Sequence, residues 1–286
     1  MSLIEALALG VIQGLTEFLP ISSTAHLRVV PALLGWDDPG AAFSAVIQCG
    51  TLLAVCVALR RDLAAMLRDW VAVLRTGRPP ATAAGRAGLF IVVGTVPIVA
   101  AGLAFKDFIK GPLRSMEVVI AALLAATAVM AGAEWAARRR ARRGAGGRDG
   151  LESLGWADCL AMGCAQALAL VPGTSRSGIT IATGMLGGLD RRTAARFSFL
   201  LSLPAIAAAA VLEVVEERHA LLGSREAIAA AACGTLAAAV VGYAAIRWLL
   251  RMLTSHTLWP FIAYRLALAG LLAWSLAAGF VPAAAG

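Results

Sequence analysis

Chemically active side chains gather in one short stretch near the N-terminus, between two apolar runs. The stretch Leu15–Leu27 reads LTEFLPISSTAHL and places Glu17 and His26 on either side of the hydroxyl run Ser22–Thr24. A carboxylate, hydroxyls and an imidazole can together supply a base, a nucleophile and a proton carrier. A polar surface loop is the alternative interpretation, so the elements around the stretch decide between the two.

A second polar turn, Pro172–Gly178, reads PGTSRSG and adds the guanidinium of Arg176. In the first turn, Pro20 ends one predicted helix, and the hydroxyl residues that follow suit the N-cap of the next helix. A helix N-terminus presents free N–H groups and the positive end of the helix dipole. Two such N-termini that face each other around Arg176 form a receptor for a tetrahedral oxyanion, because a planar guanidinium can hold two phosphate oxygens.

Glu17 makes a passive anion-binding site unfavourable. A carboxylate beside a bound phosphate is repulsive unless it takes a proton, binds a cation or pairs with an arginine. Gln13 lies four residues earlier, on the same helical face. The set suits phosphoryl transfer to water, with Arg176 and the helix dipoles stabilising the equatorial oxygens. Glu17 is also the candidate ligand for Mg²⁺ or Ca²⁺, since both cations favour oxygen ligands.

The residues leave the nucleophile open. Either Ser23 attacks phosphorus with His26 as its base, or a water activated by Glu17 attacks and Ser23 only binds the substrate. Structural roles are the alternatives for single residues: hydroxyls that only cap helices, or glycines that only allow close helix packing. Arg265 lies inside an apolar run. We expect it to pair with a buried carboxylate that the sequence does not identify.

The composition indicates an integral membrane protein. Of the 286 residues, 60% are hydrophobic and only 15% are charged, and the mean hydropathy is +0.80. A soluble domain is nearer one-quarter charged. The net charge is +8, but the basic residues lie in short loops between apolar runs, without interleaved aromatic residues, so nucleic acid is excluded as a partner. No cysteine lies in a CxxC pair, which indicates buried free thiols.

Hydrophobic runs predict the membrane spans, each of which needs about 20 apolar residues. The predicted full spans are 41–59, 87–105, 116–137, 197–215, 226–246 and 258–279. Residues 62–75 carry charges at helical spacing, which is typical of an interfacial amphipathic helix. The segments 3–34 and 154–189 are apolar at their ends but are interrupted by proline, hydroxyl and charged residues.

Loop charges orient these spans. The arginine-rich loops 60–86 and 138–148 are expected on the cytoplasmic side. The loop 106–115 then lies outside, although it also carries basic residues. Segment 41–59 therefore runs inward, and segment 197–215 runs outward.

The two halves of the chain share a spacing of residues. Gln13 aligns with Gln166, Pro20 with Pro172 and Ser23 with Ser175.

Broken hydrophobic segments in matching positions of two halves point to a duplicated membrane protein with its site between the halves. The predicted fold is an all-α polytopic membrane protein, a single membrane domain over 1–286. Its inverted repeats are 1–137 and 154–286, joined by a basic cytoplasmic linker, 138–153. About six full transmembrane helices accompany two re-entrant helical hairpins, whose polar turns meet near the bilayer midplane.

At these residues the chain resembles a known family. QGLTEFLPISSTAHL, from Gln13, and PGTSRSGIT, from Pro172, look like the two motif regions of bacterial undecaprenyl-diphosphate phosphatases of the bacitracin-resistance type. The likeness extends over nearly the whole chain and includes the late PFIAYR segment. It implies hydrolysis of undecaprenyl diphosphate to the monophosphate and phosphate, which recycles the lipid carrier of cell-wall synthesis. It also implies a divalent-cation requirement and bacitracin resistance on overproduction.

The resemblance assigns roles by position. Glu17, Ser23, His26 and Arg176 match the catalytic residues, with Glu17 also at the metal. The substrate-binding set matches Gln13, Ser22, Thr24, Gly173, Thr174, Ser175, Ser177, Gly178 and Thr180. The family allows Glu or Gln at Gln13, so a metal clamp of two carboxylates is not available here. Ala25 stands where glycine is also common, a minor departure.

The same resemblance implies a multi-pass protein of the bacterial cytoplasmic (inner) membrane, with the site facing the outer, periplasmic side. Its partners are then the polyprenyl lipid and the bilayer, and a homodimer stays open. A lipid-phosphate flippase or anion transporter is the rival function, but it would need no nucleophile or base. The membrane phosphatases with paired histidines and a PSGH-like motif are excluded, because this chain has three histidines and no such motif.

Overall fold

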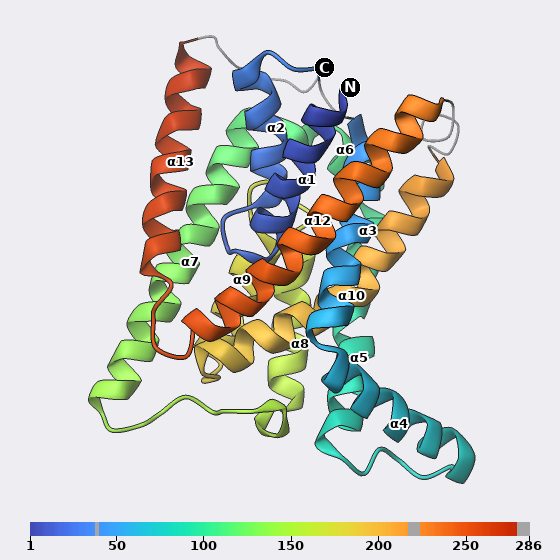
Figure 1. The fold of residues 1–286 in the computed structure, drawn as a ribbon. Coiled ribbons are helices and arrows are strands. Elements are labelled where there is room, and N and C mark those ends of the chain that lie inside the picture. Colours follow the sequence, from blue (N-terminus) through green and yellow to red (C-terminus); the bar gives the residue numbers. More distant parts are fainter. Residues whose placement is uncertain (38–39, 217–223, 279–286) are drawn as a thin grey trace.

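The computed structural model describes residues 1–37, 40–216 and 224–278, and within these ranges the ordered elements are helices (Figure 1). Two short 3₁₀ turns, Pro112–Arg114 and Leu151–Ser153, accompany them. The helices are α1 (Leu3–Phe18), α2 (Ser23–Leu34), α3 (Gly40–Ala58), α4 (Arg60–Thr76), α5 (Ala83–Ala104), α6 (Lys106–Lys110), α7 (Met116–Arg142), α8 (Trp156–Leu168), α9 (Arg176–Leu186), α10 (Arg191–Glu216), α12 (Arg225–Met252) and α13 (Trp259–Ala277).

Within the described residues, five helices are long and apolar enough to cross a membrane: α5, α7, α10, α12 and α13. They correspond to five of the six predicted spans, although residue 279 lies outside the described ranges. The sixth, 41–59, is α3, which qualifies only together with α4, and the two are bent by 77°. The all-helical, multi-pass character is thereby confirmed.

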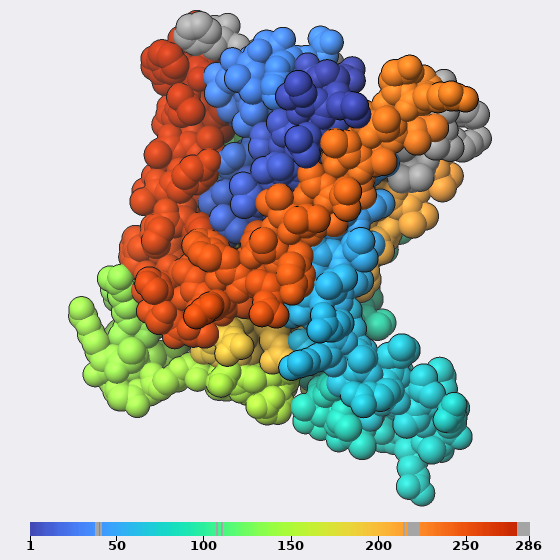
Figure 2. Space-filling view, viewed as in Figure 1, coloured from blue at the N-terminus to red at the C-terminus, as the bar shows by residue number. Residues whose placement is uncertain are grey.

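The amphipathic segment predicted at 62–75 is helix α4. Most of its residues are exposed or half-buried, and Met66 is the one buried residue of this helix. Figure 2 shows that α4 and the loop after it stand out from the body of the molecule at the lower right. The bend after α3 therefore separates a charged helix from the apolar bundle.

The long helices run in two directions (Figure 1). In this view α3, α7 and α12 run from the top of the molecule to the bottom, whereas α5, α10 and α13 run from the bottom to the top. The basic residues of α4 and of the stretch after α7 lie at the bottom. Residues 138–142 of the predicted linker continue α7 as helix.

Both interrupted segments form helical hairpins. Helices α1 and α2 are separated by residues 19–22, and α8 and α9 by residues 169–175. In the described part of the chain, Ser22 and Ser175 are the non-glycine residues with positive φ, at 74° and 68°. Each is the N-cap residue of the helix that follows. In this geometry Ser22 corresponds to Ser175, one residue away from the predicted pairing of Ser23 with Ser175, because the second turn has one more residue after its proline.

Glycine contacts join each hairpin to a helix from the other half of the chain. A Cβ on Gly10 of α1 would overlap the backbone of Gly234 in α12, and a Cβ on Gly163 of α8 would overlap the backbone of Gly94 in α5. Small residues let two helix backbones approach closely, which is how helices gain contact inside a membrane. The hairpins are therefore fixed by helix crossings that only glycine permits.

Paired charges hold the lower end of the bundle. Glu134 of α7 is fully buried and accepts hydrogen bonds from Arg191 and from the backbone N–H of Leu258. Arg196 pairs with Asp62, which joins α10 to α4. Because each buried carboxylate has a cationic partner, these contacts fix the positions of α7, α10 and α13 without an uncompensated negative charge.

We expect Gly10→Ala to lower the stability of the protein by about 1–3 kcal/mol, because the added methyl group forces α1 away from α12. The matched control is Gly270→Ala in α13, where a Cβ would meet no atom within 4 Å. The apparent midpoint of thermal unfolding in detergent measures both effects. Equal midpoints for Gly10→Ala and the wild type would contradict the packing described here.

Candidate active site

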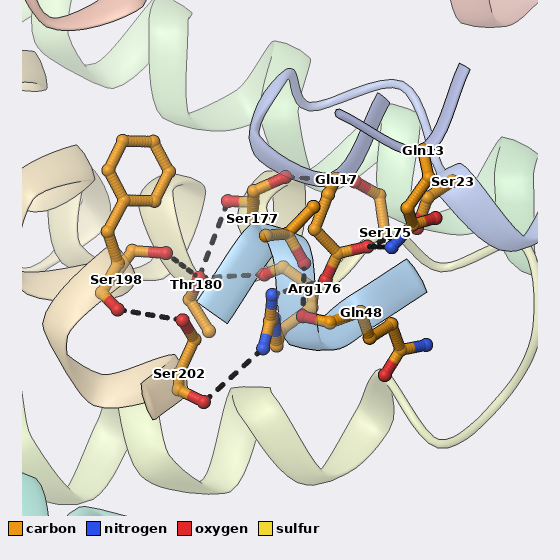
Figure 3. A network of polar contacts seen from close by, with 12 residues as sticks. Gln13, Glu17, Ser23, Gln48, Ser175, Arg176, Ser177, Thr180, Ser198 and Ser202 are labelled. Carbon is orange, nitrogen blue, oxygen red and sulfur yellow. Dashed lines mark hydrogen bonds and ion pairs between the residues drawn. The ribbon is translucent and has the colours of Figure 1, made fainter. Parts of the chain in front are cut away.

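Glu17 lies in the last turn of α1 and is the centre of the polar cluster (Figure 3). Its Oε2 accepts hydrogen bonds from Ser23 Oγ at 2.6 Å and Gln13 Nε2 at 3.0 Å, and its Oε1 accepts one from Arg176 Nη2 at 2.5 Å. The side chains of Glu17 and Arg176 are only 9% and 15% exposed. One carboxylate thus links both turns through a shielded ion pair, since Arg176 belongs to the second hairpin.

Ser23, the first residue of α2, points its hydroxyl at this carboxylate. Ser23 Oγ donates a hydrogen bond of 2.6 Å to Glu17 Oε2, so Glu17 is a proton acceptor in direct contact with that hydroxyl. A hydroxyl becomes an effective nucleophile when an adjacent base takes its proton. The geometry therefore fits Glu17, rather than His26, as the base for Ser23 or for a water in its place.

His26 is held by two other groups. Its Nδ1 lies 2.7 Å from the backbone oxygen of Ser22, and its Nε2 lies 2.6 Å from the hydroxyl of Tyr264. Because a carbonyl oxygen only accepts, we assign the proton to Nδ1, which leaves Nε2 to accept from Tyr264. Both ring nitrogens are engaged, so the predicted arrangement with His26 as the base of Ser23 is not formed here.

The second turn contributes Arg176 at the first position of α9. Beyond Glu17, its Nη1 donates weakly to the backbone oxygen of Ser202, at 3.5 Å. Ser177 donates its hydroxyl to Leu19 O at 3.2 Å, which ties the second turn to the first. Thr24 of the first turn accepts from the backbone N–H of Gly173 at 3.4 Å. The two turns are therefore in direct contact.

Other predicted residues hold the turns in shape. Ser175 caps α9 by accepting from the backbone N–H of Gly178, and Thr180 shares a hydrogen bond with Ser198 of α10. Gly173 has a φ of 95°, and a Cβ there would overlap the backbone of Val119. Only glycine fits this position, so the close approach of the second turn to α7 depends on it.

The remaining predicted residues lie in the same region. Ser22 Oγ is 3.2 Å from Thr24 Oγ1. Gln13 is fully buried, and Thr174 is buried with its backbone oxygen facing α13. Of the predicted set, Glu17, Ser23, Gln13 and Arg176 share one hydrogen-bonded cluster, and His26 lies apart from it across the first turn.

Tyr264 and Arg265 of α13 were not predicted as site residues, yet they contact both turns. Arg265 donates to Thr127 Oγ1 at 2.7 Å and to the backbone oxygens of Leu123, Gly173 and Thr174. The prediction of a buried carboxylate partner is wrong, because Arg265 forms no salt bridge with any described residue. An arginine inside an apolar run was the available signal, but its partners are backbone oxygens that no sequence pattern identifies.

The residues around Glu17 partly fit a hard cation. Across the described ranges, no group of three or more His, Cys, Asp or Glu side chains could hold a metal by itself. Gln13 donates its Nε2 to Glu17, and its Oε1 is buried without a hydrogen-bond partner among the described residues. A carboxylate, this free amide oxygen and phosphate oxygens from a substrate form the kind of open oxygen set that Mg²⁺ accepts.

The sequence matches the family model described as bacitracin resistance protein BacA over residues 6–271. The chain belongs to the BacA family. An undecaprenyl-diphosphatase from Chlorobium phaeobacteroides (strain BS1) is 49% identical over 268 residues, covering 94% of this chain and 95% of that relative. One from Chlorobium limicola is 46% identical over 283 residues, covering 99% and 100%. The predicted family resemblance is confirmed, and the BacA range contains both turns as well as α13 up to residue 271.

We expect Ser22→Gly to stabilise the protein relative to Ser22→Ala, by about 1 kcal/mol. Both variants lose the contact with Thr24, but glycine adopts the observed φ of 74° without strain, whereas alanine keeps a Cβ that is strained there. At the matched position, Ser175→Gly should be less stable relative to the wild type than Ser22→Gly is, because it removes the hydroxyl that caps the N–H of Gly178. Thermal unfolding in detergent ranks the three variants, and a less stable Ser22→Gly than Ser22→Ala would exclude strain at this turn.

Proposed function

We infer that this chain is an undecaprenyl-diphosphatase that hydrolyses undecaprenyl diphosphate to undecaprenyl phosphate and phosphate, and that it thereby confers bacitracin resistance. The family match over residues 6–271 and the names of the close relatives support this activity. The observation that carries the chemistry is the position of Glu17, whose carboxylate contacts both the hydroxyl of Ser23 and the guanidinium of Arg176.

In the proposed binding step, the phosphate of the substrate replaces Glu17 as the anion that Arg176 binds. The terminal phosphate of the substrate enters between the N-termini of α2 and α9, where helix N–H groups and dipoles favour negative charge. Arg176 transfers hydrogen bonds from Glu17 to phosphate oxygens, which it can hold in pairs. Glu17 then loses its guanidinium partner and keeps its hydrogen bond from Ser23 Oγ.

In the proposed chemical step, Ser23 Oγ attacks the terminal phosphorus while Glu17 takes its proton. The bond from phosphorus to the bridging oxygen breaks, and undecaprenyl phosphate leaves. Water then releases phosphate from Ser23. The alternative is direct attack by a water that Glu17 activates and Ser23 orients. In both routes Arg176 stabilises the equatorial oxygens, and His26 serves as a proton carrier, positioned by Ser22 and Tyr264.

A divalent cation, Mg²⁺ or Ca²⁺, is part of this proposal. Glu17 and the free amide oxygen of Gln13 would hold it together with substrate oxygens. When bound, such an ion neutralises charge on the diphosphate.

The proposed topology is an inverted repeat over 1–137 and 154–286. It is supported by the matching positive φ at Ser22 and Ser175, and by the glycine crossings of α1 with α12 and of α8 with α5. It is also supported by the opposite directions of α3 and α10 in Figure 1. Both hairpins would then be re-entrant, with their turns near the bilayer midplane, where protein covers their irregular backbone.

The proposed orientation places the basic lower end of Figure 1 in the cytoplasm and the site on the periplasmic side of the inner membrane. The first hairpin, α1–α2, enters the bundle from the opposite, upper end. A homodimer stays a prediction, because the structure describes a single chain.

Lipid-phosphate or anion transport is the second candidate, because hairpins that enter from opposite ends also suit alternating access. The short contact between Ser23 and Glu17 favours hydrolysis, since a carrier needs no activated hydroxyl.

We expect Glu17→Gln to reduce phosphate release from undecaprenyl diphosphate by about 10²–10⁴-fold, because the proton acceptor is lost. Arg176→Gln should reduce it by about 10²–10³-fold, because charge on the transferring phosphate is no longer stabilised. The control is Glu117→Gln, which neutralises an exposed carboxylate at the start of α7 and should keep the wild-type rate. The assay uses detergent-purified protein with Mg²⁺, Ca²⁺ or EDTA. Folded wild type that releases no phosphate with any cation would leave transport as the leading function.

Acid quench during turnover separates the two nucleophiles. With substrate labelled in its terminal phosphate, we expect label on the protein at Ser23, and none in Ser23→Ala, because Ser23 Oγ already contacts its base. Label that passes only to free phosphate, with residual turnover in Ser23→Ala, would assign the attack to water.

A further inference from the structure

Arg265 carries a buried charge that no carboxylate pairs with in the described part of the chain. It is 0% exposed and is among the largest fully buried side chains of the protein. Two other shielded arginines each pair with a carboxylate: Arg176, 15% exposed, with Glu17, and Arg191, 24% exposed, with Glu134. Arg265 forms no such pair among the described residues, and its Nη1 has no hydrogen-bond partner.

An isolated buried charge is costly, and a guanidinium does not escape the cost by losing its proton. The oxygens of Thr127, Leu123, Gly173 and Thr174 accept hydrogen bonds from Nε and Nη2, but they are neutral dipoles. Among the described residues, the acceptors that Arg265 contacts are therefore all neutral.

Arg265 lies at the junction of the two turns. The backbone oxygen of Gly173 accepts from Arg265, while the N–H of the same residue donates to Thr24 in the first turn. The preceding residue, Tyr264, bonds to His26 of α2, the helix that follows the first turn. The guanidinium holds the oxygens of Gly173 and Thr174, and these oxygens precede the N-terminus of α9 directly. An anion at that N-terminus meets free N–H groups, while these two carbonyl oxygens are turned to Arg265.

The charges at this junction do not balance. Glu17 contributes one negative charge, and Arg176 and Arg265 contribute one positive charge each, so these three groups carry a net positive charge. The ion pair already offsets Arg176. A monophosphate would occupy Arg176 alone, whereas a diphosphate presents a second anionic group.

We propose that Arg265 is a second anion-binding residue of the site, which holds the phosphate of a diphosphate ester that Arg176 does not hold. This inference rests on the proposed function and deepens it, because it gives the site a preference for diphosphates over monophosphates. The unpartnered Nη1 supplies the donor, and the negative charge comes from the substrate. Binding at Arg265 breaks no covalent bond, and both phosphates stay ionised.

The test measures binding rather than turnover, so it does not depend on hydrolysis. Isothermal titration calorimetry in detergent compares methylenediphosphonate, a diphosphate analogue that cannot be hydrolysed, with inorganic phosphate. We expect Arg265→Gln to weaken binding of methylenediphosphonate by about 10–100-fold, the loss of one charge-assisted hydrogen bond, and to change phosphate binding much less. Arg265→Lys, which keeps the charge, should retain most of the preference for the diphosphonate.

Thr127→Val is the matched control, because it removes the acceptor of Arg265 Nε and leaves the charge in place. We expect it to preserve the preference for methylenediphosphonate. If Arg265→Gln does not fold, the comparison of Arg265→Lys with Thr127→Val carries the test. Equal loss of both ligands in Arg265→Lys, or unchanged diphosphonate binding in folded Arg265→Gln, would overturn the proposal. Wild type that binds the diphosphonate but does not hydrolyse the lipid would refute the proposed function and leave this inference standing.

Discussion

The ion pair between Glu17 and Arg176 is the interaction on which the site depends, because it joins two hairpins that are far apart in the sequence. A shielded carboxylate and guanidinium each compensate the other, and removal of either one leaves an uncompensated charge among apolar helices. In the proposed reaction, the incoming phosphate takes Arg176 away from Glu17, and the carboxylate keeps its contact with the hydroxyl of Ser23.

The two turns can hold such a pair only because their backbone departs from helix geometry at matched places. Ser22 and Ser175 take positive φ values immediately before α2 and α9. Helices α2 and α9 begin directly after these residues, so hydroxyls lie beside both helix N-termini and their positive dipole ends. The surrounding helices must cover the irregular backbone, and the glycine crossings of α1 and α8 bring them close enough to do so.

Much of this arrangement could be predicted from the sequence, because it follows from local patterns. Apolar length predicted the long helices, and the polar interruptions predicted both hairpins. The four-residue spacing placed Gln13 on the same helical face as Glu17, where the two side chains bond. The partner of Arg265 and the contact between Tyr264 and His26 could not be predicted, since they depend on how α13 packs against both turns. The same limit applies to Ser23: spacing placed Glu17 and His26 near it alike, and only the direction of the side chains distinguishes them.

The crossing of α1 with α12 has a consequence for biosynthesis. Gly10 is translated well before its contact, Gly234, because most of the sequence lies between the two residues. Domains otherwise tend to assemble from the N-terminus onward as the chain is made. Here the crossing of α1 with α12 cannot form until α12 has been translated. Glu17, in the last turn of α1, is therefore synthesised long before the helix that packs against α1.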